Sequence, residues 1–178
     1  MHNFDVIVVG GGASGFFTAI NLAEQNPDLR IAILERSNEV LSKVKISGGG
    51  RCNVTHACFI PNVLAKFYPR GEKELKGPFH TFCTGDVMEW FGERGVSLKI
   101  EEDGRVFPES DSSQTIIDCF LNEADNFNIK IIKQTIVQQL SKADDFWKIE
   151  TSKDTYQAKQ VVMATGSNVK IWDLLKTV

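Results

Sequence analysis

The sequence predicts an α/β fold, in which a parallel β-sheet carries helices on both faces and is accompanied by a small antiparallel meander and an inserted, loop-rich α+β segment. Three observations lead to this prediction. The apolar run 4–9 passes directly into a glycine-rich turn and an amphipathic segment, the pattern of a strand followed by a helix. The segment 160–166, which ends in glycine, is typical of another buried parallel strand. Short segments between 136 and 158 indicate antiparallel strands.

The glycine-rich turn has the spacing Gly-x-Gly-x-x-Gly, and its candidate ligand-binding residues are Gly10, Gly12, Ala13, Ser14 and Gly15. Between a strand and a helix, this spacing is typical of a Rossmann-like dinucleotide-binding unit. The first glycine permits a tight turn, the second lets the backbone approach a pyrophosphate, and the third lets the helix pack on the strand. The N–H groups that begin the helix, expected over 16–25, attract the phosphates.

A second strand, expected over 30–35, completes the βαβ unit. Its last residue is Glu35, about 20 residues beyond the third glycine, where a carboxylate accepts a hydrogen bond from a ribose hydroxyl. We therefore predict that the chain binds a dinucleotide. These residues by themselves do not choose between a flavin and a nicotinamide cofactor.

A second glycine cluster supplies further candidate binding residues, namely Ser47, Gly48, Gly49, Gly50, Arg51, Cys52 and Asn53. Bare backbone donors flanked by a guanidinium and an amide suit an anionic or polar ligand. The alternative is a surface turn, in which Arg51 forms an ion pair with Glu35, Glu39 or another acid and Asn53 stabilises the turn.

The pattern of the chain changes twice, which predicts three segments. Residues 1–58 form the first part of the nucleotide-binding domain, 59–124 an inserted excursion and 125–178 the returning part. Within the excursion we expect loops around the prolines, helices over 86–94 and 114–125, and a strand over 96–100. In the returning part we expect antiparallel strands over 129–132, 136–140, 147–151 and 156–158. The helical pattern at 171–177 has no closing residue, so we expect the chain to be part of a longer protein.

Composition narrows the function classes. A net charge of −3 without basic clusters argues against a nucleic-acid partner. The apolar start of the chain contains Asp5 and lacks a positively charged leader, and no apolar run reaches the roughly 18 residues of a membrane span. We therefore expect a cytoplasmic protein with a small-molecule substrate. The four cysteines match no zinc spacing, so we expect no metal.

Four motifs together resemble one family. They are the opening glycine fingerprint, the loop 45–55 around Ser-Gly-Gly-Gly-Arg-Cys-Asn, the turn Gly104-Arg105-Val106-Phe107-Pro108 and the triplet Ala164-Thr165-Gly166. The chain thereby resembles the BaiN/RdsA-like (aminoacetone oxidase) flavoproteins of the glutathione-reductase-type FAD superfamily, over essentially its whole length. Members of that family are about twice as long, and their later half carries a substrate-facing domain and a segment that covers the flavin.

The resemblance implies FAD as the cofactor of an oxidoreductase, with NAD(P)H as a candidate donor. It assigns the diphosphate to the first loop, the adenosine ribose to Glu35 with Arg36 beside it, and the adenine to the backbone near Val137. It also assigns the ribityl chain to loop 47–53, and it implies that Ala164, Thr165 and Gly166 close over the cofactor.

Several alternatives stay open at the level of sequence. The chain could instead be an NAD-binding dehydrogenase or a non-catalytic dinucleotide-binding domain. Cys52 and Cys58 are candidates for a redox pair, although disulfide reductases of this superfamily space their cysteines differently. Residues 105–108 are candidates for lining the substrate or the flavin edge. The catalytic acid or base is unknown.

Overall fold

The computed structural model describes residues 2–176, which divide into two compact units. The first unit comprises the chain up to Lys43 and from Phe120 onward, and the second comprises residues 44–119. The domain boundaries expected at 58/59 and 124/125 stay predictions. No helix within residues 2–176 has the length and apolar character needed to cross a membrane.

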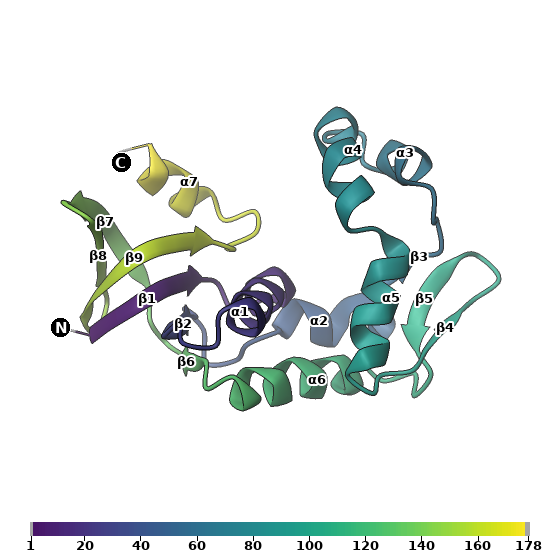
Figure 1. Cartoon of the computed structure of the whole chain (residues 1–178), viewed down its shortest axis with the longest axis horizontal. Coiled ribbons are helices and arrows are strands. Elements are labelled where there is room, and N and C mark those ends of the chain that lie inside the picture. Colours follow the sequence, from purple (N-terminus) through teal and green to yellow (C-terminus); the bar gives the residue numbers. More distant parts are fainter. Residues whose placement is uncertain (1, 177–178) are drawn as a thin grey trace. The chain divides into compact units, whose positions relative to one another are not determined.

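The first unit is built on a six-stranded sheet with the order β6-β2-β1-β9-β8-β7 (Figure 1). Its elements are β1 His2–Val9, α1 Ala13–Gln25, β2 Ile31–Leu34, β6 Lys130–Ile132, β7 Val137–Ala143, β8 Phe146–Thr151, β9 Thr155–Met163 and α7 Val169–Leu175. The strands β6, β2, β1 and β9 run parallel, whereas β9, β8 and β7 form an antiparallel meander. The α/β fold predicted from the sequence is confirmed.

Two details of the predicted strands are wrong. Segment 129–132 was expected to be antiparallel, but β6 pairs in parallel with β2. The chain between these strands is a long crossover that ends in a helix, and such a connection returns a strand in the same direction. The segments expected at 156–158 and 160–166 belong to one strand, β9, which ends at Met163, three residues before Gly166. It pairs in parallel with β1 along one edge and antiparallel with β8 along the other.

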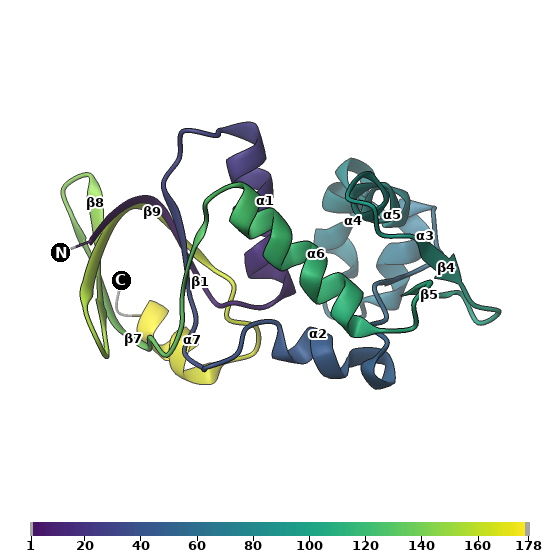
Figure 2. The ribbon, with the colours of Figure 1, turned by 90° about the horizontal axis from the view of Figure 1, so that it is seen from below.

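The two faces of this sheet are covered differently. On one face, α1 contacts β1, and Phe16 of α1 packs against Phe120 of helix α6 (Ser113–Asn126) at 6.0 Å between ring centroids. Figure 2 shows this part of α6 beside α1. On the other face, alternate residues of β1 and β2 form a core with the meander and with the leucines of α7. Residues of this core, or packed against it, include Ile7, Val9, Leu34, Leu140, Ile149, Leu174 and Leu175.

The second unit contains a three-stranded antiparallel sheet with the order β3-β5-β4, formed by Thr55–His56, Arg105–Pro108 and Leu98–Ile100. Its helical elements are α2 Ser42–Ile46, which spans the boundary, η1 Ser47–Gly50, α3 Pro61–Leu64, η2 Ala65–Phe67, α4 Glu72–Thr81 and α5 Thr84–Glu93. The predicted helix at 86–94 is thus present and begins two residues earlier. Val106 and Phe107 are completely buried, so their side chains form core and do not line a site as we had expected.

Helix α4 was not predicted, because Gly77 and Pro78 are typical of a loop. Pro78 lies inside this helix, where proline removes one backbone hydrogen bond and is unfavourable. The helix continues past it, and the Phe82 N–H donates to the Pro78 carbonyl at 2.8 Å. Two acidic residues in the first turn, Glu72 and Glu74, favour the start of this helix through its dipole.

Asp5 on β1 bonds Arg30, which directly precedes β2, and Lys159, which lies in the middle of β9. Its carboxylate accepts from the Arg30 N–H at 3.0 Å and pairs with Lys159 at 2.9 Å. The Arg30 backbone and the Lys159 ammonium lower the pKa of Asp5 to about 2. Because this pKa is depressed by folding, the stabilisation is complete above the unfolded value near 3.9 and is lost as the pH falls toward 2.

We expect Asp5→Asn to unfold at lower denaturant concentration at neutral pH, by about 1–2 kcal/mol after allowance for solvent screening. At pH 2 most of this difference should have disappeared, because Asp5 is then about half protonated in the folded chain and almost fully protonated in the unfolded chain. Urea titrations at pH 7, 4 and 2 measure this. An equal difference at all three pH values would contradict the assignment.

Candidate dinucleotide-binding site

The turn after β1 brings three segments of the first unit together. Gly10 has φ +115°, its N–H donates to the Leu34 carbonyl at 2.8 Å, and the Ala164 N–H donates to the Val9 carbonyl at 2.8 Å. A Cβ atom on Gly10 would overlap the carbonyl oxygen of Ala164. Glycine at this position therefore lets the turn lie directly against the segment that follows β9.

The third glycine of the turn, Gly15, lies inside α1 and is buried. A Cβ atom on it would overlap the carbonyl oxygen of Gly10 and would also contact the Val8 side chain at 3.5 Å. The absence of a side chain is what allows the first turn of α1 to pack on the end of β1. This packing fixes the direction of the helix axis relative to the loop.

The second glycine, Gly12, is the N-cap of α1, and it differs from the other two. A Cβ atom there would have no atom within 4 Å, and the backbone angles, φ −92° and ψ −176°, suit any residue. No contact within the chain therefore requires glycine at this position. The N-cap supplies no side chain to the first-turn N–H groups, and the next side chains, Ala13 and Ser14, are exposed. This open space at a helix N-terminus fits a diphosphate.

Glu35, directly after β2, bonds the backbone of the glycine turn. Its Oε2 accepts from the Gly11 N–H at 2.8 Å, while its Oε1 accepts from the Ser37 N–H at 2.8 Å and from the Ser37 hydroxyl at 2.5 Å. Partial burial alone would raise the pKa of Glu35, but the hydrogen bonds from Ser37 and Gly11 outweigh burial and lower it. The carboxylate is therefore ionised and fixed in direction, and Oε2 keeps a lone pair for a further donor.

Ser37 was not singled out from the sequence. A hydroxyl residue two positions after an acid, in a turn, is a local pattern that could have indicated this pairing.

The other predicted residues of this unit lie directly after β9, at the start of β7 and next to Glu35. Ala164 and Thr165 are half-buried against Gly10, and Gly166 (φ +61°) is exposed, with the Lys43 ammonium 3.6 Å from where its Cβ would lie. Val137 is buried at the start of β7, close in sequence to Thr135, whose N–H donates to the Glu35 carbonyl at 2.9 Å. Arg36 is exposed. Contacts of all these residues with a cofactor stay predictions.

The second glycine cluster lies in the second unit and has an unusual backbone. Gly48, Gly49 and Gly50 all have positive φ, and so does Cys52. A Cβ atom on Gly48 would lie 2.7 Å from both the Asn53 nitrogen and the Phe107 ring, whereas one on Gly49 would meet nothing within 4 Å. The Ser47 hydroxyl donates to the Val44 carbonyl at 3.0 Å. The loop is thus tightly wound, with an open side at Gly49 and with Asn53 exposed.

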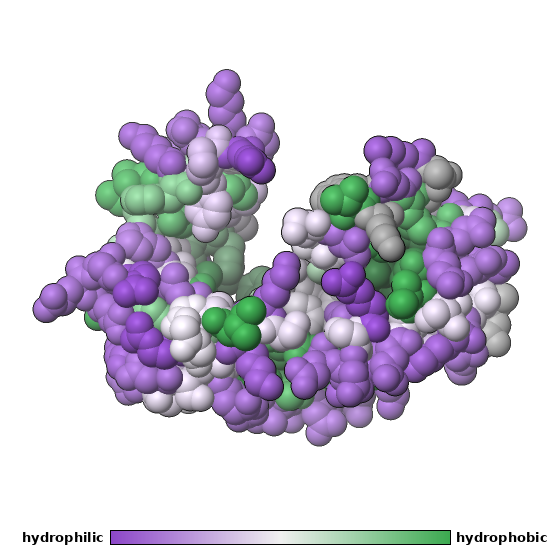
Figure 3. Space-filling view, turned by 180° about the vertical axis from the view of Figure 1, so that it is seen from behind, coloured by the Kyte–Doolittle hydropathy of each residue, from purple (hydrophilic) through white to green (hydrophobic). Residues whose placement is uncertain are grey.

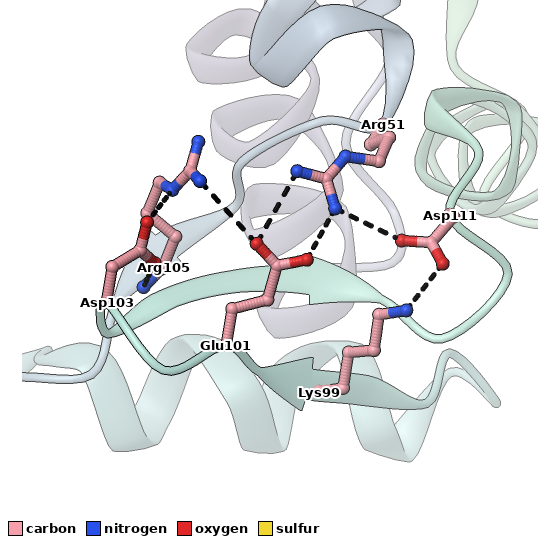
Figure 4. Close-up of polar contacts among 6 residues, drawn as sticks. All are labelled: Arg51, Lys99, Glu101, Asp103, Arg105 and Asp111. Carbon is pink, nitrogen blue, oxygen red and sulfur yellow. Dashed lines mark hydrogen bonds and ion pairs between the residues drawn. The ribbon is translucent and has the colours of Figure 1, made fainter.

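Arg51, the cation of this loop, is engaged within the unit (Figure 4). Its guanidinium bonds both carboxylate oxygens of Glu101, at 2.5 and 3.5 Å, lies 3.4 Å from Asp111, and stacks on the Phe107 ring at 3.9 Å. The hydrogen bond with Glu101 raises the pKa of Arg51 further. The ion-pair alternative is therefore realised, with Glu101 and Asp111 rather than with Glu35 or Glu39.

The surrounding charges extend this pairing into a charged network of six residues: Arg51, Lys99, Glu101, Asp103, Arg105 and Asp111 (Figure 4). It contains three cations and three anions, so the positive charge of Arg51 is already compensated. This weakens the case for Arg51 as a binding site for an anion. A structural role, joining the glycine cluster to the β4–β5 hairpin, accounts for its contacts.

The four cysteines are all reduced. Cys52 is buried, and burial raises the pKa of its thiol despite a hydrogen bond with Ser47. Cys58 contacts Cys83, a neighbour that the sequence did not indicate when Cys52 and Cys58 were considered as a pair. Within residues 2–176, no group of three or more His, Cys, Asp and Glu side chains is arranged to hold a metal ion.

A parallel sheet with a glycine turn at the start of the first helix, an acid at the end of β2 and a neighbouring strand against the turn defines a Rossmann-type dinucleotide-binding domain. Comparison with known proteins agrees with this class. Residues 4–170 match the model of the HI0933-like protein Rossmann domain, and the chain belongs to the HI0933-like family.

Characterised relatives are substantially longer than this chain. It is 27% identical over 160 residues to a 3-dehydro-bile acid delta(4,6)-reductase of Clostridium scindens, covering 89% of this chain and 38% of the relative. It is 26% identical over 166 residues to a ribosomal RNA dihydrouridine synthase of Escherichia coli, covering 93% and 40%. The chain thus spans about two fifths of these relatives. Among solved structures, THI4 of Thermovibrio ammonificans has the same fold, with a TM-score of 0.65, 16% identity and coverage of 98% and 62%.

Proposed function

We propose that this chain is the FAD-binding part of an oxidoreductase that acts on a small organic substrate. The observation that carries the proposal is the open space at Gly12, at the N-terminus of α1 and beside the fixed carboxylate of Glu35. Family membership and the names of the two relatives, a reductase and a dihydrouridine synthase, support the assignment to redox chemistry.

The first unit offers groups for the diphosphate and for a ribose hydroxyl of the adenosine diphosphate moiety. The N–H groups of Ala13, Ser14 and Gly15, at the start of α1, would donate to the diphosphate, and the helix dipole adds to the attraction. The free lone pair of Glu35 Oε2 would accept from a ribose hydroxyl. When bound, FAD supplies the transfer of hydride or electrons, and the protein sets its position and surroundings.

The names of the two relatives have a chemical feature in common. A delta(4,6)-reductase and a synthase of dihydrouridine both saturate a carbon–carbon double bond. We propose the same reaction class here, with NAD(P)H as the electron donor and a small unsaturated carbonyl compound as the substrate. The net charge of −3 favours such a molecule over an RNA.

The test is to purify the protein and identify what it carries. We expect a yellow preparation whose visible absorption bleaches on anaerobic addition of NADH or NADPH, and which releases FAD, identified by mass, on acid treatment. A colourless protein that releases NAD would identify a dehydrogenase. A protein that takes up no FAD in titration would refute the proposal. Bound FAD that neither nucleotide reduces would exclude the NAD(P)H donor only.

Glu35→Gln tests the role of the carboxylate. Every group that bonds Glu35 is a donor, so the amide nitrogen of glutamine would face a donor instead of accepting from it. We expect the affinity for FAD to fall about tenfold, equivalent to about 1.4 kcal/mol, and the stability to fall by about 1 kcal/mol. Fluorescence titration with FAD measures the first and urea unfolding the second.

The matched control for this variant is Glu89→Gln, on an exposed position of α5 in the second unit. It makes the same chemical change and should alter neither quantity. Unchanged FAD affinity in Glu35→Gln would remove Glu35 from the binding site.

A further inference from the structure

Two cysteines far apart in the sequence lie together in the second unit. Cys58 follows β3, and Cys83 is the N-cap of α5. The Cys83 thiol lies 3.9 Å from the carbonyl oxygen of Cys58, while the Cys58 thiol lies 4.0 Å from the carbonyl oxygen of Ile60. Both side chains are partly exposed and therefore accessible to small oxidants.

The backbone around both cysteines is fixed. The Thr84 hydroxyl donates to the His56 carbonyl at 2.9 Å, which ties the start of α5 to β3. The Cys83 N–H donates to Asp86 at 2.6 Å, and the Asp86 N–H bonds the Cys83 sulfur. The Cys83 sulfur is thus held against Cys58. Rotation of the Cys58 side chain away from Ile60 is the movement that a disulfide would require, since the geometry of such a bond is strict.

The other two cysteines are in different surroundings. Cys52 and Cys119 are buried, at 6% and 7% exposure. Burial also raises the pKa of Cys52, which lowers the fraction of the reactive thiolate. An oxidant in solution should therefore react first with Cys58 and Cys83.

The two cysteines flank a segment of helices and loops in the second unit. Residues 59–82, between the two cysteines, contain α3, η2 and α4. This segment exposes five large apolar side chains, namely Phe59, Ile60, Val63, Phe67 and Tyr68. Figure 3 shows hydrophobic surface in the region of α3. A covalent bond between its ends would restrict the freedom of the whole segment.

We propose that Cys58 and Cys83 are a site of reversible oxidation, which joins them in a disulfide and closes residues 59–82 into a loop. The oxidant is hydrogen peroxide. One thiol ionises and its thiolate attacks an oxygen of the peroxide. The O–O bond breaks, the sulfur becomes a sulfenic acid, and the leaving hydroxide takes up the released proton as water. The second thiol then ionises and attacks that sulfur, the S–S bond forms as the S–O bond breaks, and the leaving hydroxide takes up the second proton as water. The two sulfurs together lose two electrons to the peroxide, and a dithiol reductant reverses the change.

The experiment treats the purified protein with a small excess of hydrogen peroxide, blocks the remaining thiols and maps peptides by mass spectrometry without reduction. We expect the number of free thiols to fall from four to two, with a peptide pair that joins Cys58 to Cys83. Oxidation should raise the melting temperature by about 5–10 °C, and dithiothreitol should reverse this rise. Cys58→Ser and Cys83→Ser should each lose both effects, whereas Cys119→Ala should retain them.

Four outcomes would overturn the proposal. In the first, all four thiols remain free, and in the second, a disulfide forms that involves Cys52 or Cys119. In the third, the disulfide joins two molecules, and in the fourth, Cys83 becomes a sulfinic acid without a cross-link. The mapping is done on the unaltered chain, so a variant that fails to fold does not affect it. None of these outcomes depends on whether the protein binds FAD.

Discussion

Gly12→Ala is expected to weaken FAD binding strongly while leaving the chain folded. The reason lies in the difference between the three glycines of the turn. Gly10 and Gly15 are required by contacts within the chain, but a Cβ atom on Gly12 would point into open space from a backbone conformation that alanine adopts readily. If the diphosphate of FAD occupies that space, the added methyl group collides with it and not with the protein.

The expected size of the two effects separates binding from folding. We expect the affinity for FAD to fall about 100-fold or more, equivalent to about 3 kcal/mol. The stability of the cofactor-free protein should fall by about 1 kcal/mol at most, because alanine is a poorer N-cap than glycine. Fluorescence titration with FAD and urea unfolding of the cofactor-free protein measure the two quantities.

Gly92→Ala is the matched control for this variant. Gly92 lies inside α5 of the second unit, and a Cβ atom there would likewise meet nothing within 4 Å. In a helix interior, alanine is favoured over glycine by about 1 kcal/mol, so this variant should be slightly more stable and should bind FAD unchanged. Normal FAD binding by Gly12→Ala would mean that the diphosphate does not lie at the start of α1.

The strands and the glycine turn of the first unit could be predicted because local sequence determines them. Residues 6–9 and 161–163 are continuous apolar runs, and the spacing of Gly10, Gly12 and Gly15 has a physical meaning for each glycine. The pairing of β6 could not be predicted, because three residues in an extended conformation have the same pattern whether their neighbour is parallel or antiparallel. That choice depends on the connection through α6, a tertiary property.

In the candidate site, too, the contacts between residues could not be predicted from local sequence. Glu35 was predicted from its place after β2, yet its bond to Gly11 depends on how the turn folds. The pairing of Arg51 with Glu101 joins residues 50 positions apart, and the chain offers many acids at comparable distances. The contact between Cys83 and Cys58 is likewise long-range. Local patterns thus indicated candidate site residues, and the fold determines which of them lie together.

Gly15→Ala is expected to destabilise the fold itself, in contrast to Gly12→Ala. A Cβ atom on Gly15 would overlap the carbonyl oxygen of Gly10, a backbone atom that cannot rotate away. Gly10 is in turn fixed by its hydrogen bond to Leu34 and by its contact with Ala164. The helix would have to move away from β1, which would also disturb the buried Phe16 and Ile20 of α1.

We expect Gly15→Ala to lose about 3 kcal/mol or more of unfolding free energy, as overpacking against fixed backbone costs in a well-packed core. Urea unfolding of the cofactor-free protein is the decisive measurement, because it is independent of any ligand. FAD binding should also be lost, but only as a consequence of the displaced helix. A stability equal to that of the unaltered chain would show that α1 does not pack on the turn as described, and the positions of the first-turn N–H groups would then have to be reassigned.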